Sequence, residues 1–183
     1  DKFTARGIDY KGIIRREAPT TTKLRVIGGH QQMLRLDFED TEPVCEHYAE
    51  RLIDYVEQSL QNGLDAVIIS DYGKGACTED VCTRIIDECH NMAVPVFVDP
   101  KGVEWEKYAG ADYITPNFKE LNAVLSKPIR NRDEYIEQAA RQVMDKYNVK
   151  NVLATRSEYG MSLVPPEEGV VHITTKAQAA SDL

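Results

Sequence analysis

VPVFVDPKG, residues 94–102, decides the fold class of this chain. Its first five residues include three valines and a phenylalanine, a run typical of a buried strand of a parallel sheet. The run then ends on Asp99, Pro100, Lys101 and Gly102, which do not continue a buried strand. Ligands of open parallel sheets bind just beyond the carboxyl ends of the strands. A core strand that brings a carboxylate and a lysine to its end therefore predicts a parallel α/β sheet with a site at that edge.

Further apolar runs along the chain alternate with segments of helical pattern. Strands are predicted at AVIIS (66–70), DYIT (112–115) and NVLAT (151–155), and MSLV and VVHIT around the PPEEG turn predict a terminal hairpin. Thr78, followed by Glu79 and Asp80, predicts the start of a helix. Alternation of strand and helix predicts right-handed βαβ units and a mainly parallel sheet covered on both faces.

The first forty residues have a different residue pattern. The runs IIRRE (13–17), KLRVI (23–27) and QMLRLDFE (32–39) are short, β-rich and separated by turn residues. Apolar and polar residues alternate in KLRVI and MLRLDF, which predicts antiparallel strands whose apolar face covers another part of the molecule. We therefore expect an antiparallel β lid at 1–42 and an α/β nucleotide-binding body at 43–183.

Composition narrows the class of protein. The 183 residues carry 22 basic and 30 acidic side chains, a formal net charge of −8, with no basic run that would attract nucleic acid or an anionic membrane. No apolar stretch approaches a membrane span, and the opening residues do not resemble a signal peptide, so a cytoplasmic protein is expected. Cys45, Cys77, Cys82 and Cys89 form no C-x-x-C pair, which favours free thiols over zinc or a disulfide.

Polar residues follow every predicted strand. Asp71 and Lys74 follow 66–70, Asn117 and Glu120 follow 112–115, and Arg156 to Gly160 follow 151–155. Each could be only a cap, a turn former or a solvated lysine. Together at one edge they are typical of a nucleotide triphosphate site with hydrated Mg²⁺. Neither a P-loop nor a G-x-G-x-x-G fingerprint is present.

The motifs at these positions carry a family resemblance. In order they are PTTTKLRV (19–26), QQMLRLDFE (31–39), SDYGKG (70–75), VDPKG (98–102), TPNFKE (115–120), TRSEYGMSL (155–163) and TTKAQAASDL (174–183). The sequence resembles the ribokinase-like (PfkB) carbohydrate kinases, and within them the kinase domain of the bacterial heptose 7-phosphate kinase/ADP-heptose synthase family. The fold that this implies is a ribokinase-like three-layer sandwich with a mainly parallel central sheet and a small antiparallel β lid.

The resemblance implies ATP-dependent phosphorylation of the anomeric hydroxyl of D-glycero-D-manno-heptose 7-phosphate, a step toward lipopolysaccharide core. It implies ATP and Mg²⁺ as cofactors, with Glu120 holding the metal through water. The alternating pattern of the lid, which leaves one face and the strand edges uncovered, separately predicts a homodimer formed through the lid. The ATP-binding residues would be Asn117, Phe118, Lys119, Glu120, Thr155, Ser157, Glu158 and Gly160. The candidates for phosphate or sugar are Asp71, Lys74, Asp99, Lys101, Lys23, Arg25 and Arg35.

Two parts of the family pattern do not occur in the sequence. The family's Gly-Ala-Gly-Asp motif, which holds the general base, is expected after Leu183, and its opening strand and Gly-Gly sugar segment before Asp1. We therefore expect a chain truncated at both ends, without a catalytic base and inactive alone. The exact acceptor, the anomer, the native length and a fused nucleotidyltransferase domain stay open.

Two alternatives also remain. One is another PfkB kinase for a different sugar or nucleoside. The other is a non-catalytic receiver-like module, with Asp71 or Asp99 as phospho-acceptor and Lys101 as its partner.

Overall fold

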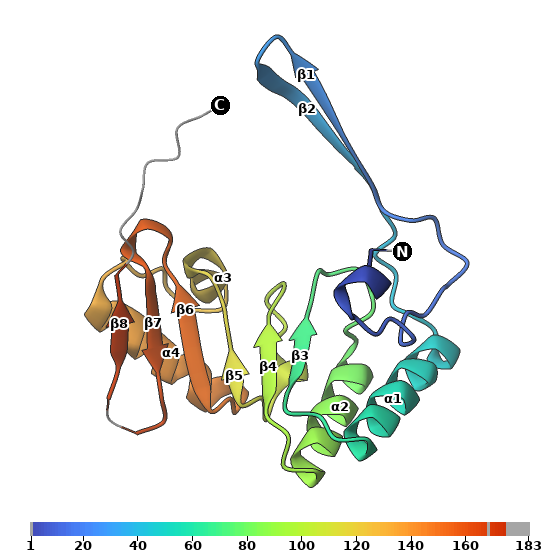
Figure 1. Cartoon of the computed structure of the whole chain (residues 1–183). Helices are drawn as coiled ribbons and strands as arrows, with labels where there is room; N and C mark the ends of the chain where they lie inside the picture. Colours follow the sequence, from blue (N-terminus) through green and yellow to red (C-terminus); the bar gives the residue numbers. More distant parts are fainter. Residues whose placement is uncertain (1, 168, 175–183) are drawn as a thin grey trace.

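β4, Val96–Asp99, lies inside a six-stranded sheet in the computed structural model of the protein, which describes residues 2–167 and 169–174. The strand order follows the sequence, β3-β4-β5-β6-β7-β8, and the first four strands are parallel while the last two are antiparallel (Figure 1). The other strands are β3 (Val67–Ser70), β5 (Tyr113–Ile114), β6 (Asn151–Thr155), β7 (Met161–Val164) and β8 (Val171–Ile173). The predicted mainly parallel sheet and terminal hairpin are confirmed, and the hairpin extends the sheet.

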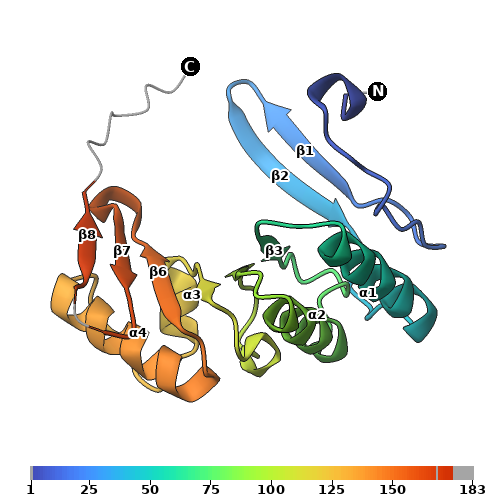
Figure 2. The ribbon, with the colours of Figure 1, turned by 60° about the horizontal axis from the view of Figure 1, so that its bottom comes forward.

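Four α-helices accompany the sheet, and three of them, α1, α2 and α4, lie in a row along one side of it (Figure 2). They are α1 (Glu46–Gln61), α2 (Glu79–Asn91), α3 (Phe118–Ala123) and α4 (Asp133–Tyr147), with short 3₁₀ turns η1 (Thr4–Arg6), η2 (Glu106–Tyr108) and η3 (Ser157–Tyr159). Thr78 caps α2 as predicted, because its Oγ1 accepts the Val81 N–H at 3.3 Å. None of the described helices is both long and apolar enough to cross a membrane.

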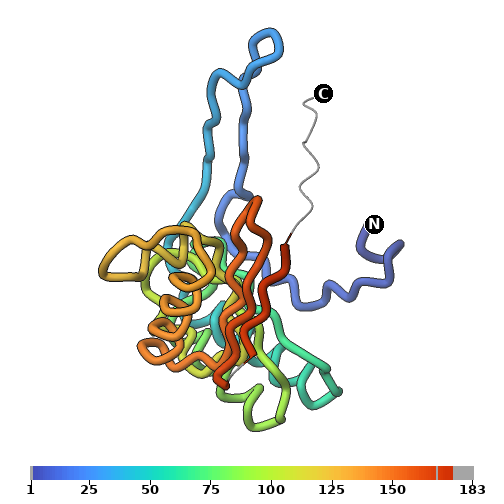
Figure 3. The backbone as a smooth tube through the Cα atoms, turned by 90° about the vertical axis from the view of Figure 1, so that its left-hand side faces the viewer, coloured from blue at the N-terminus to red at the C-terminus, as the bar shows by residue number. Residues whose placement is uncertain are grey.

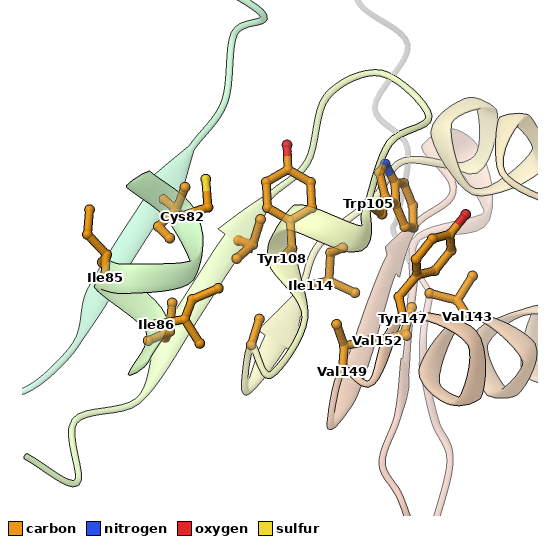
Figure 4. Close-up of a cluster of buried hydrophobic side chains, with 14 of the residues drawn as sticks. Cys82, Ile85, Ile86, Trp105, Tyr108, Ile114, Val143, Tyr147, Val149 and Val152 are labelled. Carbon is orange, nitrogen blue, oxygen red and sulfur yellow. The ribbon is translucent and has the colours of Figure 1, made fainter. Parts of the chain in front are cut away.

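The core fills the space between these helices and one face of the sheet (Figure 4). Alternate strand residues such as Val98, Ile114 and Val152 are fully buried there. Trp105 and Tyr147 pack beside them with ring centroids 5.7 Å apart. Burial of such side chains contributes roughly 1.5–3 kcal/mol each, so this face stabilises the sheet and sets its register.

The opposite face of the sheet is more open. Ile68 is 74% exposed on this face. The rings of Phe97 and Tyr113 stack with centroids 4.6 Å apart, and both side chains are only partly buried. The predicted α/β fold is therefore confirmed with helices against one face.

A long β-hairpin projects from the body (Figures 1 and 3). It consists of β1 (Thr22–Gly28) and β2 (Gln31–Phe38), paired antiparallel with a bulge between Val26 and Ile27. The prediction of a strand at 13–17 was wrong. Ile14 and Arg16 line a cavity beside α1, so this run packs on a helix and has no strand partner. The lid boundary at residue 42 stays a prediction.

Candidate active site

The register of the parallel strands brings their carboxyl ends to one level. Ser70, at the end of β3, pairs with Asp99 at the end of β4, and the Thr115 N–H donates to the Val98 carbonyl at 2.8 Å. Asn117 forms a parallel bridge with Thr155 at the end of β6. The ends of three strands and the start of α3 therefore lie at one edge of the sheet (Figure 1).

Asn117 and Glu120 form a reciprocal cap at the start of α3. Asn117 Oδ1 accepts the Glu120 N–H at 2.9 Å, and Glu120 Oε2 accepts the Asn117 N–H at 3.0 Å. This capping box accounts for the N-x-x-E spacing in purely structural terms. It uses only the oxygen of the Asn117 amide, and within the described part of the chain no hydrogen bond uses Asn117 Nδ2. The amide N–H₂ group therefore stays available as a donor at an exposed position.

Lys101 connects this cap to the loop after β3. Its Nζ lies 3.4 Å from Glu120 Oε1, and its side chain is 54% exposed. A Cβ atom on Gly73 would lie 3.4 Å from Lys101 Cγ, so the two loops lie close to each other. Asp99 is exposed, and its Oδ2 accepts a long hydrogen bond of 3.4 Å from Ser70 Oγ. An exposed cation thus stands beside the carboxylate of the capping box.

Asp71 is held by the protein itself. Its Oδ2 accepts from Lys107 Nζ at 2.6 Å and from the Tyr108 hydroxyl at 2.7 Å, and its Oδ1 accepts the Gly73 N–H at 2.6 Å. Burial alone would raise the pKa of Asp71, but the bonds from Lys107, Tyr108 and Gly73 outweigh it and lower that pKa. Burial and the bond to Asp71 raise the pKa of Tyr108. This geometry favours a role for Asp71 in ordering the loop.

Lys74 and Gly75 attach the same loop to the base of the hairpin. Lys74 forms an ion pair with Glu39, directly after β2, and Gly75 O accepts the Val44 N–H at 2.9 Å. A Cβ on Gly75 would lie 1.9 Å from Glu42 O, so the close approach requires glycine. The ammonium group of Lys74 is therefore paired with a carboxylate at the base of the hairpin.

The basic candidates of the hairpin lie apart from this edge. Arg25 and Arg35 are register partners on β1 and β2, and Lys23 pairs with Asp37. Arg35 Nε also donates to Asp37 Oδ1 at 3.0 Å. Two arginines side by side repel each other, so an anion or another acidic group would stabilise this face.

The loop after β6 has both exposed and structural members. Thr155, Ser157 and Glu158 are exposed, whereas Gly160 is buried with φ of +81°. A Cβ on Gly160 would lie 1.9 Å from Ile173 O, which explains the glycine by packing. Phe118 packs against the core, and Lys119 is exposed. Neither takes part in the capping box of Asn117 and Glu120.

Arg156 was predicted to lie at this edge, but no role in binding ATP, phosphate or sugar was predicted for it from the sequence. It is 2% exposed, and it donates to Asn131 Oδ1 at 2.8 Å, Asp133 Oδ1 at 2.6 Å and Ser162 Oγ at 2.9 Å. The hydrogen bond from Arg156 lowers the pKa of Asp133. Arg156 thus ties the loop that follows β6 to the start of α4. Its places directly after the predicted strand 151–155 and inside TRSEYGM were the signals in the sequence.

The sequence matches the description "pfkB family carbohydrate kinase" over residues 1–182, nearly its whole length. The chain belongs to the pfkB family. This finding replaces the receiver-like alternative, and the burial of Asp71 agrees with it, because a phospho-acceptor must be accessible.

Relatives with curated names support a narrower placement. The bifunctional protein HldE of Trichlorobacter lovleyi is 37% identical over 182 residues, which cover 99% of this chain and 37% of that protein. HldE of Coxiella burnetii is 39% identical over 166 residues, which cover 90% of this chain and 33% of that protein. The chain therefore spans about a third of the length of these relatives.

Solved structures show the same fold. The crystal structure of Sa239 aligns with a TM-score of 0.74 at 17% identity, covering 100% of this chain and 58% of that one. Ribokinase of Arabidopsis thaliana, solved with ribose and ATP, aligns with a TM-score of 0.58 at 18% identity, covering 80% of this chain and 46% of that one. At such identities the likeness establishes a ribokinase-like fold and nothing finer.

The Asp71 network predicts a pH dependence of stability. Replacement of Lys107 by Met leaves a buried carboxylate without its cation, so the free energy of unfolding should fall by about 3–5 kcal/mol at neutral pH. Because the folded-state pKa of Asp71 is lowered, its stabilising contribution is present above the unfolded value of about 4 and is lost as the pH falls through the folded value. Urea unfolding from neutral pH down to about pH 3 measures both.

The double variant Asp71→Asn/Lys107→Met is the matched control, since it removes the charge together with its partner. Its stability should depend less on pH than that of Lys107→Met. Parallel curves for the wild type and both variants would contradict the assignment.

Proposed function

We propose that this chain forms the nucleotide side of a kinase that transfers the ATP γ-phosphoryl group to the anomeric hydroxyl of a heptose 7-phosphate. The family match and the HldE relatives support a carbohydrate kinase. The heptose acceptor follows from the motifs SDYGKG, VDPKG and TRSEYGM, whose resemblance is narrower than that of the family. Another sugar or a nucleoside as acceptor is the alternative.

One observation carries the assignment, namely the grouping of Asn117, Glu120 and Lys101 at the carboxyl edge of the sheet. The Asn117 amide donor and the Lys101 ammonium can both approach phosphate oxygens, and Thr155 adds a hydroxyl beside Asn117. Phosphoryl transfer depends mainly on positioning and on charge stabilisation at the transferred group, for which such donors suffice. Lys101 would neutralise charge on the phosphates, with Asp99 and the hairpin near the sugar.

The residues fit Mg²⁺ only through water. Within the described residues, no group of three or more His, Cys, Asp or Glu side chains could hold a metal ion. Glu120 still has acceptor capacity, because its Oε2 accepts one backbone N–H and its Oε1 stands 3.4 Å from Lys101. Mg²⁺ commonly keeps several waters and binds substrate phosphates, so a single carboxylate that accepts from metal-bound water is a suitable partner. The ion would supply charge neutralisation on the phosphates.

The acceptor hydroxyl needs a base that this chain does not provide in the proposed scheme. The resemblance assigns that role to an aspartate in a Gly-Ala-Gly-Asp motif, which does not occur in residues 1–183. Loss of general-base assistance alone costs typically 10²–10⁴-fold in rate. We therefore assign nucleotide binding to the chain and the complete reaction to a longer polypeptide.

The function is tested by replacing the aligned segment of the Coxiella burnetii HldE with this chain. The chimera should form heptose 1,7-bisphosphate from ATP and heptose 7-phosphate, while residues 1–183 alone should bind MgATP without turnover. Fructose 6-phosphate and ribose are offered in parallel. Faster phosphorylation of either would replace the heptose assignment, and turnover by residues 1–183 within tenfold of the chimera would place a base inside the chain.

Glu120 separates the capping role from the metal role. Glu120→Gln keeps an oxygen that can accept the Asn117 N–H but removes the negative charge. We expect the fold to persist, and the Mg²⁺ requirement of nucleotide binding and of chimera turnover to rise by about 10–100-fold. Calorimetric titration of MgATP at limiting Mg²⁺ measures this.

Glu120→Ala, which loses both roles, should in addition lower the melting temperature. Wild-type nucleotide binding by Glu120→Gln at limiting Mg²⁺ would rule out the metal role and leave only the cap.

We further propose that the hairpin pairs two copies of the chain. Its apolar face is uncovered, with exposed fractions of 47% for Leu24, 50% for Leu34 and 59% for Phe38. The register places Leu24 opposite Leu36 and Val26 opposite Leu34, so one face is apolar and the other carries Arg25 and Arg35. An exposed two-stranded apolar face is stabilised by pairing, and the basic face would then be left for the sugar phosphate.

Two variants on opposite faces of the hairpin test this arrangement. Leu36→Asp should weaken the dimer by at least roughly tenfold, because a charge would be buried in the interface. Arg25→Ala should leave the dimer intact and raise the KM of the chimera for the sugar phosphate. Light scattering after size exclusion measures the first effect, and a strictly monomeric wild type at high concentration would refute pairing.

A further inference from the structure

Arg156 and Ser162 are two of the three polar or charged residues that are buried in the described part of the chain. Arg156 Nη1 donates to Ser162 Oγ at 2.9 Å, and Ser162 Oγ lies 2.8 Å from His172 Nδ1. Because an arginine N–H can only donate, the Ser162 oxygen accepts this bond and its own proton is free for His172. These bonds join the loop after β6 to β7 and β8, the two strands of the terminal hairpin (Figure 1).

The same guanidinium group binds the segment that leads into α4. Arg156 Nε donates to Asn131 Oδ1 at 2.8 Å, and Arg156 Nη1 donates to Asp133 Oδ1 at 2.6 Å. Asn131 Nδ2 donates back to the Arg156 carbonyl at 3.4 Å, so the backbone of Arg156 is held as well as its side chain. Hydrogen bonds from a charged group are among the stronger ones, and here they act in several directions. One buried side chain therefore fixes the start of the loop after β6.

Ser157, the next residue, has a strained backbone. Its φ is +54°, and it is one of three residues other than glycine with positive φ in the described part of the chain. A serine in this left-handed region costs energy and persists only where the surrounding structure holds it. The turn is closed by the Arg156 N–H, which donates to the Gly160 carbonyl at 2.7 Å, and by the Gly160 N–H, which donates to the Ser157 carbonyl at 3.0 Å. The strained residue thus directly follows the buried arginine.

We propose that Arg156 is a positioning residue that holds Ser157 in its left-handed conformation and so keeps the 155–160 loop in the shape that binds the nucleotide. This inference rests on the proposed function, in which the loop lies on the nucleotide side of the site. Arg156 is 2% exposed, so it acts through the loop and does not touch the ligand. Without its bonds, Ser157 relaxes toward the ordinary backbone region and the loop changes shape. Binding groups that are misplaced by about 1 Å can lose about 100-fold in effectiveness.

Arg156→Met tests the positioning role in the 183-residue chain, because methionine keeps a long side chain but makes none of the guanidinium bonds. The Kd for MgATP, measured by calorimetry, should rise about 10–100-fold. In the nucleotide-free chain, hydrogen exchange of the amides 157–160, followed by NMR, should become at least roughly tenfold faster. Arg141→Met is the matched control. Arg141 also joins α4 to the terminal hairpin, but it donates to the Pro165 carbonyl at 3.2 Å, beyond the other end of β7, so this variant should change neither readout.

Glycine at position 157 separates positioning from general stabilisation of the fold. Glycine adopts a positive φ without a steric penalty, so a loop with glycine there no longer needs Arg156 to hold the turn. Arg156→Met should therefore cost less than about threefold, in Kd and in amide exchange, when it is introduced into Ser157→Gly. A residue that only stabilises the fold would give the same loss in both backgrounds. Equal losses with Ser157 and with glycine would overturn the proposal.

The two readouts keep this inference apart from the proposed function. If the wild-type chain does not bind MgATP, the proposed function fails, and amide exchange in the nucleotide-free chain still decides whether Arg156 holds the loop. Arg156→Lys keeps a charge beside Asp133 but lacks the fork that bonds Asn131 and Ser162 together, so it should loosen the loop in the same direction. It replaces Arg156→Met if circular dichroism shows that variant to be unfolded. Wild-type exchange at 157–160 in a folded Arg156 variant would overturn the positioning role.

Discussion

Burial of one face of the sheet is the constraint on which the rest of this structure depends. Val98, Ile114 and Val152 point from neighbouring strands into the same layer of packed side chains, and a slip of one residue in any strand would expose its apolar set. The resulting register brings the strand ends to one level. The alignment of Ser70, Asp99 and Thr155 at the edge is thus a consequence of packing several residues away.

The polar residues at that edge serve two purposes at once. Asn117 and Glu120 satisfy the first backbone N–H groups of α3 and still present an amide donor and carboxylate oxygens outward. A helix of only six residues has little stability of its own, so its cap matters for holding these groups in place. The N-x-x-E spacing can therefore serve both to cap α3 and to bind a ligand.

The loop after β3 connects the parts of the molecule. Asp71 ties it to Lys107 and Tyr108, Lys74 ties it to Glu39 at the base of the hairpin, and Cys77 ends it at the start of α2. Asp71 and Lys74, which the sequence offered as ligand candidates, are thus both engaged within the protein. Lys101, by contrast, stays exposed at this edge, with 54% of its side chain accessible, next to Glu120.

Local pattern was enough to predict the apolar strands, the cap at Thr78, the terminal hairpin and the edge at which Asp99, Lys101, Asn117 and Glu120 meet, because hydrophobic period and capping act within a few residues. Tertiary structure alone decided the partners of Asp71, since Lys107 lies 36 residues away and Tyr108 lies 37. It also decided the burial of Arg156 and the lack of a strand at 13–17. The fold decides which surfaces come together, and this determines which distant charges pair and whether a segment forms a strand or a packed coil. The residues nearby in sequence do not determine it.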